Sequence, residues 1–367
     1  MHDEVMVLGA TGRTGRAIAA ELHARGVAVV LAARDRARLE EVRDALSAVA
    51  SERHGPAASS PRMVVGGFSD LLAAIGRERP GVVVNTVGPF TRTALPVVRA
   101  LPHGTHYLDL SNEYAAVDDV LRQDRRAAVA GQVLVPGAGF GVVAVESVVV
   151  RLCDGEPRPR RVRVDAIASV ATEAGTLGSA LAESIADVAA FGGAQVQDGR
   201  LVRTRRVVTD YRTITTPDGD RVGAGSGASG ELLAAWLASD ADDVVAASAL
   251  VPANPAVRAV LPLATALFRI APVRRFVVGR LSAIRFEDRP RPRASSWGHA
   301  RVEWPDGRVR EGWLRLGDAS VFTTAAAVEV ATRLLQGEGR PGAATPGVVF
   351  GADLAVAAGG VVVDAPA

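Results

Sequence analysis

Three glycines near the start of the chain have a spacing that suits the binding of a phosphate group. The apolar run at 4–8 leads directly into Gly-Ala-Thr-Gly-Arg-Thr-Gly at 9–15, and apolar residues with helical spacing follow. Glycine lets the backbone turn sharply and approach a pyrophosphate, while a helix that begins there directs N–H groups and its dipole at the negative charge. We therefore expect a dinucleotide to be bound by Gly9, Thr11, Gly12, Arg13, Thr14 and Gly15.

The residue after the next predicted strand indicates which dinucleotide this is. A ribose-reading side chain is expected roughly 20 positions beyond the glycines, and Arg34 follows the apolar stretch 27–33 there. An acidic residue would bind the ribose 2′-hydroxyl, whereas arginine pairs with a 2′-phosphate through its planar fork of donors. This predicts NADP(H), with Arg13 and Arg36 as further phosphate partners. The alternative is that Arg34 only solvates the end of a strand.

Composition narrows the class of protein. A length of 367 residues favours two domains, and 48% hydrophobic with 22% charged residues are values of a globular protein. The net charge of +2 does not indicate a nucleic-acid partner. The single cysteine, Cys153, excludes an intramolecular disulfide, and the first apolar run is too short for a signal peptide. We expect a cytoplasmic protein without a membrane span. No metal site is expected either, because the six histidines are scattered.

All 42 basic residues are arginine, since the sequence contains no lysine. Schiff-base chemistry, the phosphate loop of NTPases and the Tyr-x-x-x-Lys pair of short-chain dehydrogenases each require a lysine amine. These reaction classes are therefore excluded.

Strands and helices alternate through the first third of the chain, which is typical of a doubly wound parallel sheet, the Rossmann fold. The strands are rich in valine and leucine, so both sheet faces should be covered by helices. Strands are predicted at 4–8, 27–33, 62–66, 81–87, 106–110 and 132–135, with a helix at 37–48 and a loop at 50–61.

Ligands of such sheets lie beyond the carboxyl ends of the strands. After the fourth strand, the cofactor candidates are Asn85, Thr86, Gly88 and Phe90. At the end of the fifth strand, Glu113 and Asp109 are the first candidates for positioning the substrate or relaying a proton, followed by Tyr107. The alternatives are a loop-bracing hydrogen bond for Asp109 and buried packing for Tyr107.

These segments together carry a resemblance to a known family. The glycine turn, Asn-Thr-Val-Gly-Pro-Phe at 85–90 and Gly-Thr-His-Tyr-Leu-Asp-Leu-Ser-Asn-Glu at 104–113 are similar to the saccharopine dehydrogenase-like reductases. Within that family, the sequence most resembles the branch of trans-acting enoyl reductases. The resemblance covers residues 4 to 150, with a weaker echo at 345–353. It implies an NADPH-dependent reductase of secondary metabolism with an inserted α/β domain for substrate binding and dimerisation.

The pattern changes after residue 150. Strands are predicted at 160–167 and 205–215, a helix that opens at 176–179 and runs toward 191, and a hairpin from 299–304 and 309–314. We predict an NADP-binding domain at 1–150, an α+β substrate and dimerisation domain at 151–322, and a segment at 323–367 that returns to the first domain. Glu173, Tyr211 and His299 are further proton donors for which structural roles are expected. The proline-rich, apolar stretch 244–286 is either packing helices or a lid over a lipid-like substrate.

We therefore expect an oxidoreductase that transfers hydride to a polarised C=C bond of enoyl type, or to a C=N bond of an imine, in a biosynthetic intermediate. The substrate is a small molecule, hydrophobic or carrier-bound, and the enzyme a homodimer. Two alternatives remain open. One is a non-catalytic NADP(H)-binding redox sensor that acts through a protein partner, and the other is an isomerase or epimerase that retains its NADP.

Overall fold

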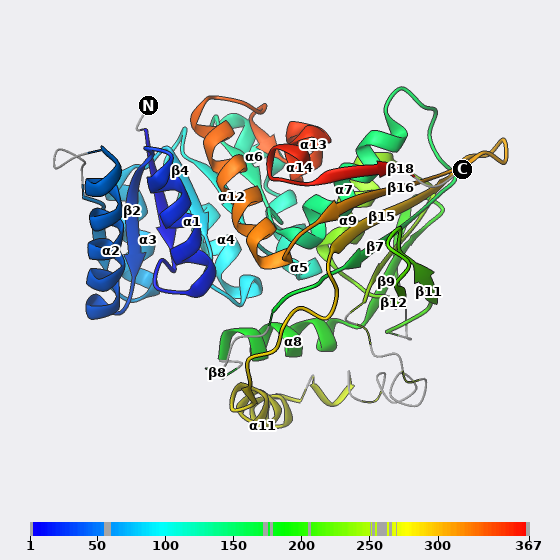
Figure 1. The fold of residues 1–367 in the computed structure, drawn as a ribbon, viewed down its shortest axis with the longest axis horizontal. Helices are drawn as coiled ribbons and strands as arrows, with labels where there is room; N and C mark the ends of the chain where they lie inside the picture. Colours follow the sequence, from blue (N-terminus) through cyan, green and yellow to red (C-terminus); the bar gives the residue numbers. More distant parts are fainter. Residues whose placement is uncertain are drawn as a thin grey trace. The chain divides into compact units, whose positions relative to one another are not determined.

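The chain forms two compact units. A computed structural model describes residues 3–54, 60–171, 175–176, 179–204, 207–249, 251, 254, 263, 266–268 and 270–364 (Figure 1). The first unit comprises residues 1–111, 119–139 and 323–344, and the second comprises 112–118, 140–322 and 345–367. Glu173 and most of the stretch 250–269 lie outside the described residues, so the expectations for them remain predictions.

The first unit is built on a parallel sheet of seven strands in the order β17-β6-β5-β4-β1-β2-β3. Its strands are β1 (Glu4–Leu8), β2 (Ala28–Ala33), β3 (Arg62–Val65), β4 (Val82–Asn85), β5 (His106–Asp109), β6 (Val133–Val135) and β17 (Gly342–Ala343). Its helices are α1 (Arg13–Ala24), α2 (Arg36–His54), α3 (Phe68–Glu78), α4 (Phe90–Ala100), α6 (Asp124–Val129) and most of α12 (Ala319–Leu335), while α5 (Tyr114–Leu121) crosses the unit boundary. Strands β1 and β4 are neighbours, so the strand order reverses between them.

The burial of these strands accounts for their apolar sequences. Residues 5–8 and 82–84 have no exposed surface, as expected for strands covered by helices on both faces. The predicted doubly wound parallel α/β fold is confirmed. Helix α2 extends through the first part of the predicted loop 50–61, to His54.

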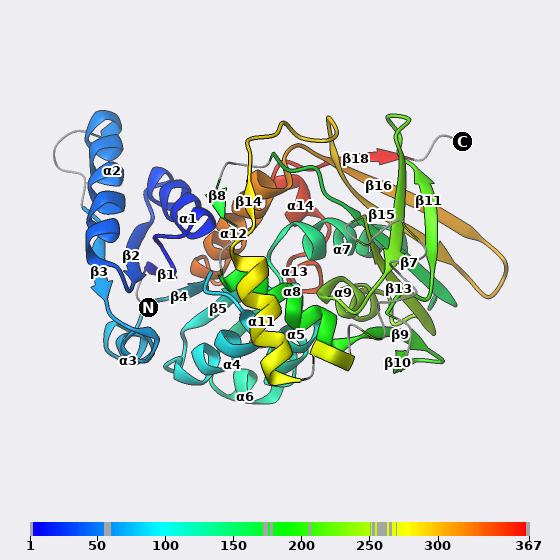
Figure 2. The same cartoon turned by 90° about the horizontal axis from the view of Figure 1, so that it is seen from below.

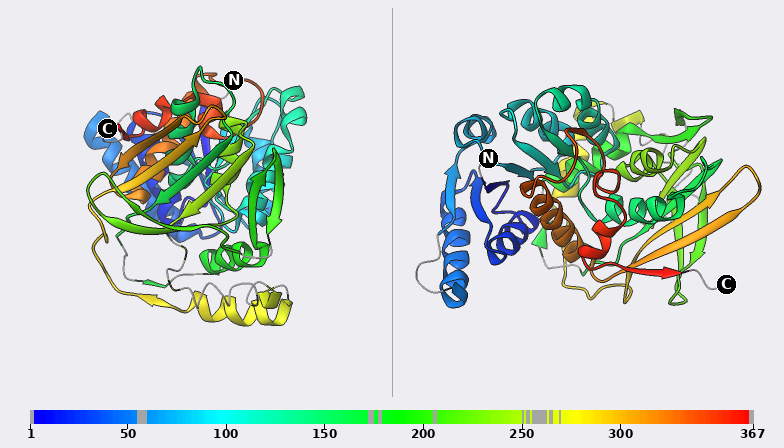
Figure 3. Two further views of the ribbon diagram at one scale, coloured as in Figure 1. Left: turned by 90° about the vertical axis from the view of Figure 1, so that its right-hand side faces the viewer. Right: turned by 90° about the horizontal axis from the view of Figure 1, so that it is seen from above.

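The second unit contains a large mixed sheet (Figure 3). Its strands lie in the order β10-β9-β13-β7-β15-β16-β18, with β12 pairing to both β11 and β13. Its strands are β7 (Arg161–Ile167), β9 (Gly193–Gln197), β10 (Arg200–Thr204), β11 (Tyr211–Thr215), β12 (Arg221–Ser226), β13 (Asp243–Ser248), β15 (Ser296–Glu303), β16 (Val309–Leu316) and β18 (Val361–Asp364). Among the described strands of this sheet, only β7 and β13 pair in parallel. The predicted hairpin is formed by β15 and β16, in register from 296 with 316 to 303 with 309.

Helices complete the second unit. They are α7 (Phe140–Cys153), α8 (Ser179–Phe191), α9 (Gly230–Ser239), α11 (Ala271–Ser282), α13 (Pro346–Phe350) and α14 (Asp353–Ala357), and β8 (Gly175–Thr176) pairs with β14 (Arg285–Phe286). Helices α7 and α9 pack against each other and against β7. Among the described helices, none is long and apolar enough to span a membrane.

The ends of the units differ from the expected boundaries. Helix α7 belongs to the second unit, although residues up to 150 were assigned to the first domain. The tail around Phe350 also belongs to the second unit, where β18 pairs with β16. The physical reason is that β16 has an open edge whose backbone groups need partners, and the valine-rich end of the chain supplies them.

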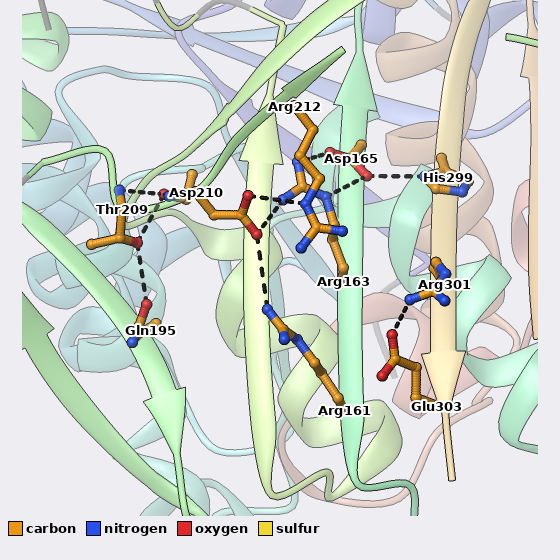
Figure 4. A network of polar contacts seen from close by, with 11 residues as sticks. Arg161, Arg163, Asp165, Gln195, Thr209, Asp210, Arg212, His299, Arg301 and Glu303 are labelled. Carbon is orange, nitrogen blue, oxygen red and sulfur yellow. Dashed lines mark hydrogen bonds and ion pairs between the residues drawn. The ribbon is translucent and has the colours of Figure 1, made fainter. Parts of the chain in front are cut away.

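A buried ionic network connects the strands of the second unit (Figure 4). Arg163 bridges Asp165 at 2.7 Å and Asp210 at 2.8 Å. His299 Nδ1 lies 2.9 Å from Asp165 Oδ2, and its Nε2 lies 2.6 Å from Glu311 Oε1. Burial alone would lower the pKa of His299, but the two carboxylates outweigh it and the net pKa is raised. The network therefore ties β7, β15 and β16 to the segment that enters β11.

Candidate functional site

The glycine turn is fixed to the carboxyl end of the adjacent strand. Gly9 has a φ of 83°, and its N–H donates to the carbonyl of Ala32 at 2.8 Å. A Cβ on Gly15 would lie 2.4 Å from the carbonyl oxygen of Gly9, and one on Gly9 would lie 2.6 Å from Thr86 Oγ1. Helix α1 can therefore approach β1 and β4 this closely only because these two positions lack side chains.

The amino end of α1 is open. Gly12 is its N-cap residue, and no side chain caps the helix. The first intrahelical bond runs from Arg16 N–H to the Gly12 carbonyl at 2.9 Å, so the N–H groups of Thr14 and Gly15 have no helical acceptor. Gly12 and Arg13 are exposed. Anions such as a pyrophosphate bind in proteins at uncapped helix ends of this kind.

Arg34 lies at the same edge of the sheet as this helix end. It directly follows β2, whose Ala32 is in register with Leu8 at the end of β1. Its side chain is exposed and, within the described part of the chain, forms no hydrogen bond or ion pair. Arg36 differs, because it pairs with Glu40 at 3.7 Å. Arg34 is thus an exposed arginine, without a partner among the described residues, at the edge of the sheet where α1 begins.

The end of β4 packs onto the glycine turn. The hydroxyl of Thr86 donates to the Leu8 carbonyl at 2.7 Å, and the Thr86 N–H donates to the same oxygen at 3.0 Å. Gly88 and Phe90 are partly exposed, and α4 begins at Phe90 without a side-chain cap. The amino end of α4 and Gly88 therefore follow the strand that packs onto the glycine turn.

Asn85, Tyr107 and Asp109 form a buried chain of hydrogen bonds below this edge. Asn85 Nδ2 donates to Tyr107 Oη at 3.3 Å, and Tyr107 Oη donates to Asp109 Oδ2 at 2.8 Å. None of the three has exposed surface. The chain is completed by Thr93, Ser111 and Gly137.

Asp109 is the acceptor at the end of this chain. Its Oδ1 accepts the Ser111 N–H at 2.9 Å, the Ser111 hydroxyl at 2.6 Å and the Gly137 N–H at 2.9 Å. Burial raises its pKa, while these donors act in the opposite direction. Burial and the neighbouring Asp109 raise the pKa of Tyr107 well above its ordinary value. The structure thus shows the loop-bracing bond that was the alternative for Asp109, joining the ends of β5 and β6.

Glu113 lies in the second unit, apart from the chain of hydrogen bonds that contains Asp109. Its carboxylate accepts the Asn112 N–H at 3.1 Å and the hydroxyl of Ser184, and its side chain is buried. The Asn112 side chain in turn donates to Glu231 at 2.8 Å and accepts from the Gly230 N–H at 3.0 Å. Glu113 therefore helps to join the segment 112–118 to α8, and Asn112 joins it to α9.

The sequence analysis did not single out Thr93, Ser111 or Gly137. A signal existed for Ser111, because it shares the strand face of Tyr107 and Asp109 at a spacing of two. For Thr93 the sequence offered no comparable signal, because it is a single polar residue on the buried side of α4. No group of three or more His, Cys, Asp or Glu residues among the described positions has the geometry of a metal site.

Comparisons with known proteins agree with part of the resemblance. No family model matches the chain. A trans-acting enoyl reductase of Mycobacterium leprae is 30% identical over 222 residues, which is 58% of this chain and 49% of that protein. The trans-acting enoyl reductase of Mycobacterium ulcerans is 32% identical over 141 residues, which is 37% of this chain and 32% of that protein. The trans-acting enoyl reductase of Mycobacterium tuberculosis H37Rv is 37% identical over 114 residues, which is 30% of this chain and 25% of that protein. The chain thus spans about half or less of the length of these relatives.

Solved structures are similar over about a third of the chain's length. YwfH, an NADPH-dependent reductase involved in bacilysin biosynthesis, is 14% identical with a TM-score of 0.32 and covers 37% of this chain and 76% of its own. A metagenomic short-chain oxidoreductase in complex with NADP is 18% identical with a TM-score of 0.31 and covers 37% of this chain and 81% of its own.

Proposed function

We propose that this protein is an NADPH-dependent reductase. The observation that carries the proposal is the uncapped amino end of α1 together with the exposed Arg34, which has no partner among the described residues, both at the carboxyl edge of a doubly wound sheet. The curated relatives are named enoyl reductases, which supports the same class of reaction.

The residues at this edge fit NADP(H). The N–H groups of Thr14 and Gly15 and the dipole of α1 would hold the pyrophosphate, which can approach because Gly12 has no side chain. Arg34 would pair with the 2′-phosphate through its fork of donors. A carboxylate at position 34 would instead repel that phosphate. Thr86, Gly88 and Phe90, at the switch point between β1 and β4, would border the nicotinamide half.

The chemistry divides between the cofactor and the chain. When bound, the cofactor supplies a hydride to the electron-poor carbon of the substrate. The chain of Asn85, Tyr107 and Asp109 holds the loops after β4, β5 and β6 in place, so we assign these three residues to positioning. Glu113 stays our candidate for positioning the substrate or relaying a proton, because it is the acidic residue that follows the fifth strand.

We infer that the acceptor is a C=C bond of enoyl type rather than a C=N bond. The names of the relatives support this preference, and so does the resemblance to the enoyl reductase branch of the saccharopine dehydrogenase-like family, of which we propose this chain is a member. A proton relay through Tyr-x-x-x-Lys is excluded, because the chain has no lysine. A hydrophobic or carrier-bound substrate, a homodimer and a cytoplasmic location remain predictions.

The test is NADPH oxidation with two panels of substrates, α,β-unsaturated thioesters and cyclic imines. We expect turnover with at least one enoyl thioester, slower turnover with imines, and lower rates with NADH than with NADPH. Tight NADPH binding without oxidation by any panel member would favour the redox-sensor alternative. Conversion of a substrate without net NADPH oxidation would favour the isomerase. Absence of NADPH binding would refute the proposal itself.

A further inference from the structure

A cavity of about 200 Å³ lies at the amino edge of the first sheet, the edge opposite to the glycine turn. Its lining includes Asp3, Gly81 and Thr105, which directly precede β1, β4 and β5. These neighbouring strands can be followed in the blue to cyan part of the chain in Figure 2. All the lining residues belong to the first unit. Pockets for drug-sized molecules have roughly 300 Å³ or more, so this cavity suits a smaller ligand.

His106 gives the cavity a hydrogen-bond donor. Its Nδ1 accepts the N–H of Val133 at 3.0 Å, so Nδ1 carries no proton. The neutral ring therefore carries its proton on Nε2, and within the described part of the chain this N–H has no acceptor. Burial lowers the pKa of His106, which keeps the ring neutral at neutral pH. The backbone of β6 thus fixes the tautomer of a ring that lines the cavity.

Arg79 gives the cavity a cation. It is the C-cap residue of α3, and its φ of 49° lies in the left-handed region, where glycine is the common residue. Its side chain is exposed and forms no hydrogen bond or ion pair with the described residues. The cavity therefore combines a guanidinium fork with an imidazole N–H, and both have unused donors.

These donors select an anion over a metal ion. His103 and Asp3 also line the cavity, three residues before His106 and at the start of β1. A ring nitrogen that carries a proton cannot ligate a metal, so His106 Nε2 is not a ligand. The described residues also contain no group of three or more His, Cys, Asp or Glu with the geometry of a metal site.

The remaining walls restrict the kind of anion. The planar fork of Arg79 matches the two oxygens of a carboxylate. The carboxylate of Asp3 repels a second negative charge, which disfavours a dianion. Pro80, Leu334 and Leu335 form an apolar wall, and Leu334 is only 1% exposed. Such a wall suits a hydrocarbon chain.

We propose that this cavity binds a small monocarboxylate with a short alkyl chain. Arg79 pairs with both carboxylate oxygens, and His106 Nε2–H donates to one of them. The alkyl chain lies against Pro80, Leu334 and Leu335. The inference does not depend on the proposed reductase function, because the site lies at the other edge of the sheet and its test measures only binding.

The test is calorimetric titration of the full chain with butanoate at neutral pH. We expect a dissociation constant on the order of 1 mM or tighter. Acetate should bind more weakly, because it lacks the chain that contacts the apolar wall, and butanamide, which has the same shape without the charge, should not bind measurably. Absence of butanoate binding, or equal binding of butanamide, would overturn the inference. Tighter binding of inorganic phosphate would also overturn it, because the cavity would then select a dianion.

Variants separate the site from the stability of the fold. Arg79→Gly removes the guanidinium and suits the left-handed backbone, so it should weaken butanoate binding about 10- to 100-fold without lowering the melting temperature. His106→Asn keeps an acceptor for the Val133 N–H but places no donor where Nε2 lies, so binding should weaken about 2- to 10-fold.

Arg77→Gln is the matched control, because Arg77 is an exposed arginine in the last turn of α3 that does not line the cavity. It should leave butanoate binding unchanged. Equal losses in Arg77→Gln and Arg79→Gly, or an unchanged affinity in Arg79→Gly, would overturn the inference.

Discussion

The carboxylate of Asp109 accepts four hydrogen bonds inside the first unit, from Tyr107, from Ser111 twice and from Gly137. Replacement by asparagine turns one acceptor oxygen into an NH2 group that faces donors. We expect Asp109→Asn to lose about 2 to 4 kcal/mol of unfolding free energy, because buried donors are left unpaired. Urea denaturation measures this loss. The control Asp44→Asn alters an exposed carboxylate and should change stability by less than about 1 kcal/mol.

A catalytic role for Asp109 makes a different prediction. In that case Asp109→Asn would retain its stability and cofactor affinity while losing turnover. That outcome would contradict the positioning role assigned to Asp109.

Gly15 offers a second test at the scale of single residues. A Cβ there would lie 2.4 Å from the Gly9 carbonyl oxygen, so Gly15→Ala must push α1 away from the glycine turn. We expect NADPH to bind at least about tenfold more weakly and stability to fall by about 1 to 3 kcal/mol. Gly76→Ala is the matched control, because a Cβ at this position in α3 has open space. It should be neutral or stabilising by up to about 1 kcal/mol, and equal effects of the two variants would contradict the packing account.

At the scale of elements, α13 depends on a buried carboxylate of α7. Glu146 accepts the hydroxyl of Thr345 and the N–H groups of Gly347 at 2.7 Å and Val348 at 3.1 Å. Burial raises its pKa from 4.5 to about 7, although these donors oppose the shift. The folded state therefore binds more protons than the unfolded state between these two values. Stability from this group is present below 4.5 and is lost as the pH rises to about 7.

The expected size of this loss is about 3 kcal/mol. Urea denaturation of the wild type and of Glu146→Gln, at about pH 5 and about pH 8, measures it. The variant lacks the titrating group, so the stability difference between the two proteins should change by about 3 kcal/mol between these conditions. A constant difference would show that Glu146 does not titrate with a raised pKa.

Local pattern was sufficient to predict six of the seven strands of the first sheet, because each is a short apolar run. It did not predict β17, which has only two residues. It did not predict the buried charges of β7. Arg163 and Asp165 alternate with Val162 and Val164, which resembles a strand with one face in water. In the fold, Arg163 pairs with Asp210 and Asp165 pairs with His299, which in turn bonds to Glu311. These partners are distant in sequence, so the pattern of one strand could not reveal them.

The same limit applied to the candidate site. The glycine turn and Arg34 were predictable because a strand, a turn and a helix follow one another directly. The buried chain from Asn85 to Asp109 joins residues on different strands, so it depends on the sheet order. Glu113 stands four residues after Asp109 but belongs to the other compact unit. The spacing of Asp109 and Glu113 in the sequence did not reveal that the chain passes from one unit to the other between Ser111 and Asn112.

At the scale of the whole molecule, the absence of lysine restricts the chemistry of every site. We predict that acylation of amines leaves the turnover of NADPH unchanged, because only an α-amino group can react. Turnover before and after treatment with an amine-directed reagent tests this, with a lysine-dependent short-chain dehydrogenase as the control that should lose activity. Inactivation of this chain would show that its α-amino group takes part.

The most direct test concerns Arg34, because the account rests on its guanidinium lying beside the open end of α1. The measurement is the pair of dissociation constants for NADPH and NADH, in the wild type and in Arg34→Asp. We predict a wild-type preference for NADPH, and in the variant a roughly 10- to 100-fold weaker binding of NADPH with little change for NADH, because one charge-assisted phosphate contact is lost. Equal weakening of both cofactors, or an unchanged preference for NADPH, would contradict the account.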